Sequence, residues 1–92
     1  MWRNTMDARV LAILKEASRA PSGLPISIGI VTDRFNAAHG SNYSAPVSHR
    51  AIGHAVRMGL HLSTEKSNGV YVVPESEKQK IDALAVRYLE PV

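Results

Sequence analysis

The feature that most constrains this chain is the dipeptide Asn68-Gly69, which lies between two short runs of strand-forming residues. Asn and Gly both tolerate the positive φ angles of a type I′ turn, so this dipeptide between such runs is the strongest short-range signal for a β-hairpin. The two runs are Leu60–Thr64 and Val70–Val73, and Pro74 ends the second. The sequence therefore predicts a hairpin over residues 60–73 that turns at Asn68-Gly69.

Apolar residues on either side of this hairpin recur instead with a helical period. The segments that show it are residues 6–20, 27–39, 48–58 and 75–89. Ser27 and Ser48 are placed as N-caps, Gly40 as the left-handed residue after the second helix, and Gly59 as the end of the third. Ile26 lies between the first two helices, either in a loop or in a minimal strand. Helices this short are not stable alone, so each must bury its apolar face against the others.

The predicted fold class is mainly α with a small β-hairpin. Three helices followed directly by a hairpin form the arrangement of a winged helix-turn-helix, here with a three-helix core, a wing and a C-terminal helix. Hydrophobic residues make up 45% of the 92 residues, which is ordinary globular content for one domain. We expect a leading segment at residues 1–6 and a single winged helix domain over residues 7–90.

A family resemblance supports this fold and covers residues 7–89. The stretch PVSHRAIGHAVRMGLHLSTEKSNGVYVVP carries most of it. It resembles the winged helices appended to the primase-helicases of phages and plasmids and to helicases of the minichromosome maintenance type. The matching positions are Ser48, Arg50, Ile52, Gly53, Val56, Gly59 and the turn Ser67-Asn68-Gly69. Because transcription regulators share the pattern, the resemblance implies DNA binding in replication or transcription control.

Two departures from the family pattern are visible in the sequence. The connection from Gly40 to Val47 is longer than the turn of three or four residues in a compact helix-turn-helix. In the expected wing, Lys66 is the one cation, and Glu65 lies next to it.

The candidate DNA contacts lie on the helix at residues 48–58 and on the wing at residues 60–73. At about 100° per residue, Arg50, His54 and Arg57 gather on the side opposite the apolar Ile52 and Val56. An arginine can read guanine in the major groove or bind a phosphate. The full expected set is Ser48, His49, Arg50, Gly53, His54, Arg57, Lys66, Ser67 and Asn68. The alternatives are an ordinary solvated helix face and turn, with Ser48 only a cap and Gly53 serving close packing against the second helix.

Composition favours an anionic partner and excludes several other classes. A net charge of +3 and a pI near 9.6 favour double-stranded DNA as the partner. The chain has no cysteine, and His49 and His54 are five residues apart, so they do not share a helix face as zinc ligands do. It also lacks a glycine-rich phosphate loop and a catalytic constellation of plausible spacing. We therefore expect no enzyme, no catalytic residue, no metal, no cofactor and no small-molecule substrate.

The sequence also bears on location and on a second class of function. The longest apolar stretches are far shorter than the roughly 20 residues of a membrane helix, and the N-terminus lacks the apolar region of a signal peptide. We expect a cytoplasmic protein, nucleoid-associated if it binds DNA, that is either a small regulator or a domain of a larger replication or recombination protein. The alternative is a winged helix for protein–protein contact, with other domains of its parent protein or as a homodimer. Leu84, Tyr88 and Leu89 of the last helix are the candidates for a dimer contact.

Overall fold

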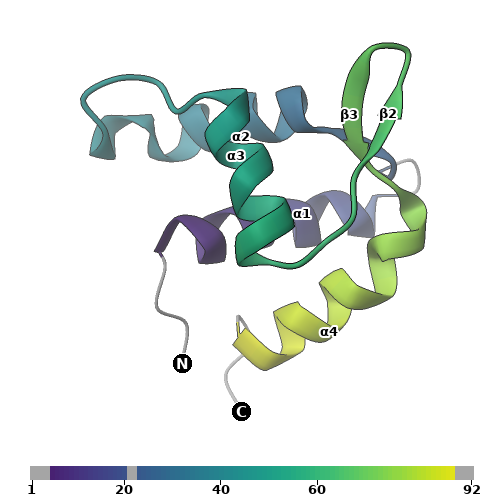
Figure 1. The fold of residues 1–92 in the computed structure, drawn as a ribbon. Helices are drawn as coiled ribbons and strands as arrows, with labels where there is room; N and C mark the ends of the chain where they lie inside the picture. The colour runs from purple at the N-terminus through teal and green to yellow at the C-terminus, as the bar shows by residue number, and fades with distance from the viewer. Residues whose placement is uncertain (1–4, 21–22, 89–92) are drawn as a thin grey trace.

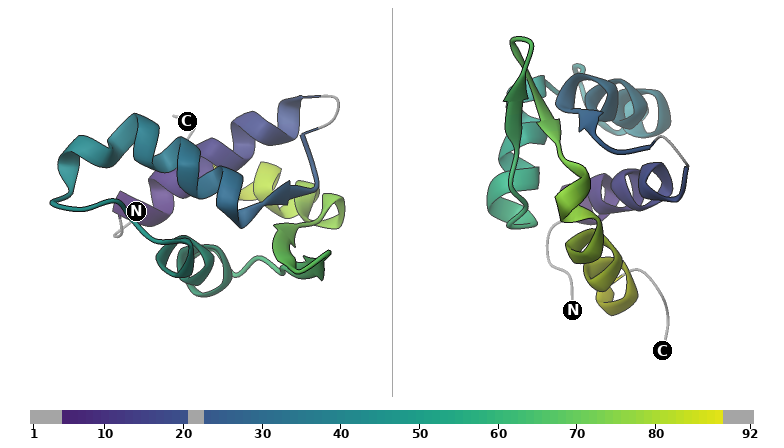
Figure 2. Two further views of the ribbon diagram at one scale, coloured as in Figure 1. Left: turned by 90° about the horizontal axis from the view of Figure 1, so that it is seen from above. Right: turned by 90° about the vertical axis from the view of Figure 1, so that its right-hand side faces the viewer.

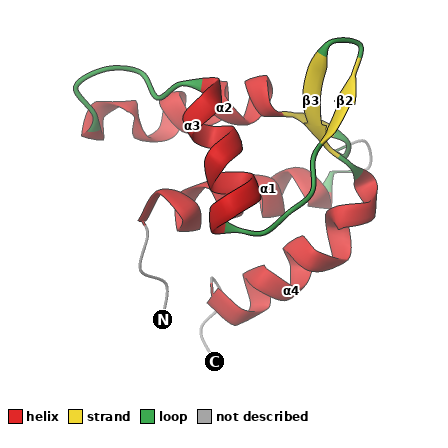
Figure 3. Cartoon of the chain, viewed as in Figure 1, coloured by secondary structure: helices red, strands yellow, loops and turns green. Residues whose placement is uncertain are grey.

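The computed structural model describes residues 5–20 and 23–88, and within them the chain forms helices and a small antiparallel sheet (Figures 1 and 3). The elements in chain order are α1 (Thr5–Arg19), β1 (Ile26–Ser27), α2 (Ile28–His39), α3 (His49–His54), β2 (Glu65–Ser67), β3 (Val70–Val73) and α4 (Lys78–Tyr88). The expectation of a mainly helical fold with a small hairpin is confirmed. No described helix has the length and apolar character needed to cross a membrane.

The sheet has the strand order β1-β3-β2, with both neighbouring pairs antiparallel. The predicted turn is confirmed, since Asn68 and Gly69 have φ angles of 52° and 85°, both positive as a type I′ turn requires. Ile26 pairs with Val73, so the minimal strand is the correct reading of that segment.

The predicted first strand of the hairpin, Leu60–Thr64, is wrong. Because the turn has only two residues, the strand residues that pair are those just before it, and β2 covers Glu65–Ser67. Leu60 and Leu62 are instead buried in the hydrophobic core. Their alternation with polar residues does not reflect a strand, because Leu60 has right-handed helical backbone and His61 has a positive φ of 56°.

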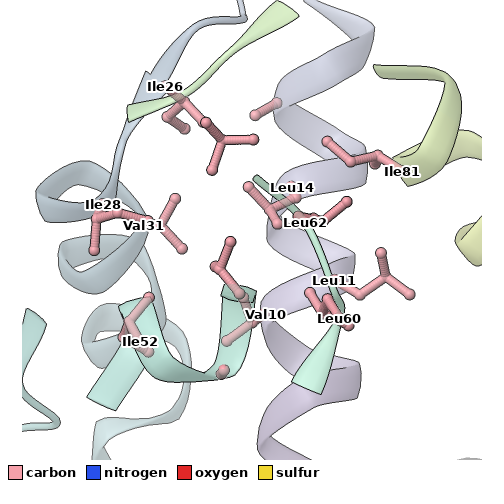
Figure 4. Close-up of a cluster of buried hydrophobic side chains, with 14 of the residues drawn as sticks. Val10, Leu11, Leu14, Ile26, Ile28, Val31, Ile52, Leu60, Leu62 and Ile81 are labelled. Atoms are coloured by element: carbon pink, nitrogen blue, oxygen red, sulfur yellow. The ribbon is translucent and has the colours of Figure 1, made fainter. Parts of the chain in front are cut away.

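The core lies between α1, α2 and α3, and α4 closes it from the other side of α1 (Figure 4). Ile52 and Val56 of the third helix are fully buried, which confirms the predicted core side of that helix. Other fully buried side chains come from the remaining helices and from β3, among them Val10, Leu11, Leu14, Val31, Phe35, Val73 and Ile81.

Both predicted serine caps are confirmed, whereas the role expected for Gly40 is wrong. The Ser27 hydroxyl accepts a hydrogen bond from the Ile30 N–H, and that of Ser48 accepts one from the Ala51 N–H, each at 3.1 Å. Gly40 has a φ of −57° and a ψ of −30°, so it is right-handed, and the chain continues from it into a 3-10 turn. A left-handed residue is not required there because the 3-10 turn itself ends α2.

The third helix ends at Gly59 as expected, although its last turn is not α-helical. Residues Ala55–Gly59 form a π-helical turn, in which the Leu60 N–H donates to the Ala55 carbonyl at 2.9 Å. The left-handed residue after the turn is His61, with a φ of 56°. Gly59 is needed for another reason, because a Cβ there would overlap the Asp7 carboxylate of α1.

The arrangement places α3 and the hairpin on the same face of the molecule. In the right-hand view of Figure 2, α3 and the hairpin lie along one edge, and α1 and α2 lie along the other. The tip of the hairpin and α4 lie at opposite ends, as Figure 1 also shows. The fold therefore presents the third helix and the hairpin together.

Candidate nucleic-acid interface

The exposed side of α3 and the hairpin enclose a groove of about 460 Å³, which we name the wing groove. The start of α2 forms its third wall. Its lining residues are Ser27, Ile28, Gly29, His49, Arg50, Gly53, Arg57, Gly69, Val70 and Tyr71. Four of the predicted site residues, His49, Arg50, Gly53 and Arg57, therefore lie together in one concave surface.

Tyr71 is the aromatic centre of a basic cluster at this groove. The Arg57 guanidinium carbon lies 5.7 Å from the centroid of the Tyr71 ring, and the Lys66 ammonium lies 5.8 Å from the same centroid. Lys66 is also the cross-strand partner of Tyr71 in the hairpin. Tyr71 remains 50% exposed. Cation–π attraction therefore holds a cation of the π-helical turn after α3 and a cation of the hairpin beside one ring.

Gly53 provides space for Arg57. Gly53 is buried, and a Cβ at this position would lie 3.1 and 3.2 Å from the two terminal nitrogens of the Arg57 guanidinium. The Arg57 side chain therefore fills this space, and not the second helix as the packing alternative predicts. The absent side chain lets the arginine fold back along its own helix towards Tyr71.

The other predicted residues lie outside the wing groove. His54 is exposed on α3 but does not line the groove; it lies on the side of α3 that approaches Asp7. Burial raises the pKa of the Asp7 carboxyl, and the charge of His54 partly opposes this effect. Ser67 and Asn68 are exposed at the wing, and Ser48 is engaged as the N-cap of α3.

The wing groove is basic. Three of its lining residues are arginine or histidine and none is Asp or Glu. Within residues 5–20 and 23–88, the ion pairs are Lys15–Asp82 and Lys80–Glu77, and neither involves α3 or the wing. The basic side chains of the groove therefore have no carboxylate that neutralises them among the described residues.

Sequence reasoning missed Tyr71 and Gly29. Tyr71 could have been predicted from the sequence, because a two-residue turn at Asn68-Gly69 sets residue 71 opposite Lys66. An aromatic ring opposite a cation on neighbouring strands is a recognisable cross-strand pair. Gly29 gave no such signal, because it joins the groove only through the tertiary contact of α2 with α3.

The described part of the chain contains no group of three His, Cys, Asp or Glu side chains able to hold a metal ion. No protein-family model, curated protein or solved structure matches the chain.

Proposed function

We propose that this chain is a winged helix domain that binds double-stranded DNA through α3 and the hairpin, in replication or transcription control. The order of the elements supports the winged helix, since a hairpin follows the third helix directly and β1 completes the sheet in the order β1-β3-β2. The observation that carries the proposal is the wing groove, where Arg50 and Arg57 line a concave surface that has no acidic lining residue.

The geometry suits a duplex for a physical reason. The major groove of B-DNA admits one α-helix, and a hairpin beside that helix can reach the adjacent groove or its phosphates. Here α3 and the hairpin occupy one face of the molecule (Figure 2). Arg50 and His54 are exposed on α3, and Lys66 is exposed on the wing. A net charge of +3 adds a long-range attraction to the DNA.

The alternative of a homodimer through the last helix has less support. Leu84 and Tyr88 of α4 pack against the hydrophobic core, so the fold already uses part of the apolar face that a dimer would need. Leu89, the third residue of that interpretation, lies outside the described residues.

A salt titration tests the proposal against the protein–protein alternative. Binding to a short duplex is measured by fluorescence anisotropy at increasing salt. We expect the logarithm of the affinity to fall linearly with the logarithm of the salt concentration, by about 0.9 for each phosphate contacted. A chain that shows no duplex affinity even at low salt is not a DNA-binding domain.

Paired substitutions then test the face. Arg50→Ala with Arg57→Ala should change the free energy of unfolding by about 0.5 kcal/mol each, because both side chains are exposed. DNA affinity should fall by about 1–3 kcal/mol for an arginine that reads a base, and by less for one that binds phosphate. The control is Ile52→Ala, which removes a fully buried side chain and should cost about 2–5 kcal/mol of stability. A folded double variant that binds as tightly as the parent would show that this face is not the interface.

A further inference from the structure

The wing groove also indicates which part of a duplex lies against the arginines; this inference rests on the proposed function. A helix in the major groove and a hairpin in the adjacent minor groove are separated by the one sugar–phosphate strand that divides those grooves. The wing groove is the space between α3 and the hairpin. We propose that it holds one sugar–phosphate strand of the duplex, and that Arg50 and Arg57 contact its phosphates and not base edges.

The charge of the groove suits a phosphodiester. His49, Arg50 and Arg57 all line it, and none of its lining residues is acidic. Arginine binds phosphate through two parallel N–H bonds, which orient the strand as well as attract it. The Arg57 guanidinium lies over the Tyr71 ring, so its direction is set before the strand arrives. These features favour the backbone of the DNA, which carries a charge at every nucleotide, over an uncharged base edge.

Each wall of the groove contributes one glycine, and one of the three has no structural explanation. Gly69 has the positive φ of its turn, and Gly53 gives space to Arg57. Gly29 in the first turn of α2 is different. A Cβ there would make only ordinary contact, at 3.8 Å from the His49 ring and the Ser27 hydroxyl oxygen. Glycine also weakens a helix relative to alanine. A position where the fold accepts a side chain, and the helix would gain from one, is explained by a ligand strand that approaches the backbone.

Phosphate contacts position a protein on DNA but carry no sequence information directly. Loss of Arg50 or Arg57 should therefore weaken binding by the same factor on duplexes of different sequence.

The test compares Gly29→Glu with Ile30→Glu. The two positions are adjacent in the first turn of α2, where a negative charge is favourable to the helix dipole, and the two variants have the same net charge. Gly29 lines the wing groove, whereas Ile30, which is 47% exposed, lines a separate groove between α1 and α2. Thermal unfolding followed by circular dichroism verifies that both variants are folded at the temperature of the binding assay. Affinity for a duplex is then measured by fluorescence anisotropy.

We expect Gly29→Glu to bind the duplex at least tenfold more weakly than Ile30→Glu. Equal affinities of the two folded variants would overturn the inference while leaving DNA binding in place. A parent chain that binds no duplex would instead overturn the proposed function. If Gly29→Glu does not fold, Arg57→Gln replaces it and is measured on several duplexes of different sequence. Equal fold-losses support the phosphate contact, and a loss confined to one sequence overturns it.

Discussion

Several side chains in this protein make specific contacts with residues that lie far away in the sequence. Glu77, at the start of the last helical segment, is buried, and its carboxylate accepts a hydrogen bond from the Ser63 N–H. The sequence predicts only that Glu77 lies in the helix over residues 75–89, whereas in the structure it anchors the segment that leads into the hairpin. Lys15 of α1 donates to Asp82 of α4 at 2.8 Å, and this pair ties the first helix to the last.

The Lys15–Asp82 pair predicts a specific dependence of stability on pH. The hydrogen bond from Lys15 lowers the pKa of Asp82 below its ordinary value of 3.8. A lowered pKa means that the folded state favours the ionised carboxylate, so the pair stabilises the fold at neutral pH. This contribution decreases below about pH 4 and is lost as the pH falls through the pKa of the folded state. Because the Asp82 side chain is 42% exposed, the contribution should be no more than about 1 kcal/mol.

Asp82→Asn is the variant that measures this effect. Urea unfolding should show a loss of stability of up to about 1 kcal/mol at neutral pH. The difference between parent and variant should shrink once the pH is well below 3.8. Asp7 acts in the opposite direction, because burial raises its pKa, so only the comparison of the two proteins isolates Asp82. A difference that stays constant with pH would show that the ionised carboxylate is not the cause.

At the scale of elements, one side chain holds the long connection between α2 and α3. The Asn36 amide donates to the Val47 carbonyl at 3.0 Å and accepts from the Val47 N–H at 2.8 Å. The Asn36 side-chain amide thus satisfies both backbone hydrogen-bonding groups of Val47, just before α3 begins. This bracing shows how a connection longer than a compact turn still places the third helix firmly against the second.

Asn36→Ala should therefore affect the position of α3 as well as stability. The loss of both hydrogen bonds should cost about 1–3 kcal/mol, measured by urea unfolding. DNA affinity, measured on the folded variant, should also fall, because the start of α3 carries His49 and Arg50. Asn42→Ala is the matched control, since Asn42 is exposed in the same connection. Equal effects of the two variants on affinity would show that the Asn36 bracing does not position α3.

At the scale of the whole molecule, α4 contributes to folding stability from a position away from the candidate interface. The last helix packs on α1, and its Ile81 is fully buried, whereas the hairpin tip lies at the other end of the molecule (Figure 1). Ile81→Ala should cost about 2–5 kcal/mol. The fraction that stays folded should bind DNA as the parent does. Val86→Ala, at a position 57% exposed on the same helix, should change stability by only about 0.5 kcal/mol. A weaker affinity of the folded Ile81→Ala variant would mean that α4 supports the interface.

The sequence by itself determined the features that depend on neighbouring residues. The turn at Asn68-Gly69 follows from two residues that accept positive φ. The serine caps follow from a hydroxyl that accepts a hydrogen bond from the backbone N–H three residues later. The buried side of the third helix, with Ile52 and Val56, follows from the helical period. The sequence also predicted four of the residues that line the wing groove, since they lie on one short helix.

Only the tertiary structure decided the features that depend on contacts between distant segments. Leu60 and Leu62 lie in the core and not in a strand, because the two-residue turn sets Glu65–Ser67 opposite β3, which ends at Val73. Gly59 lies against Asp7 of α1, and Gly29 lies in a groove whose other walls come from α3 and the hairpin, segments that are distant in the sequence. Local preference acts over a few residues, whereas burial and close approach depend on which surfaces meet when the helices pack, and a linear pattern does not contain that information.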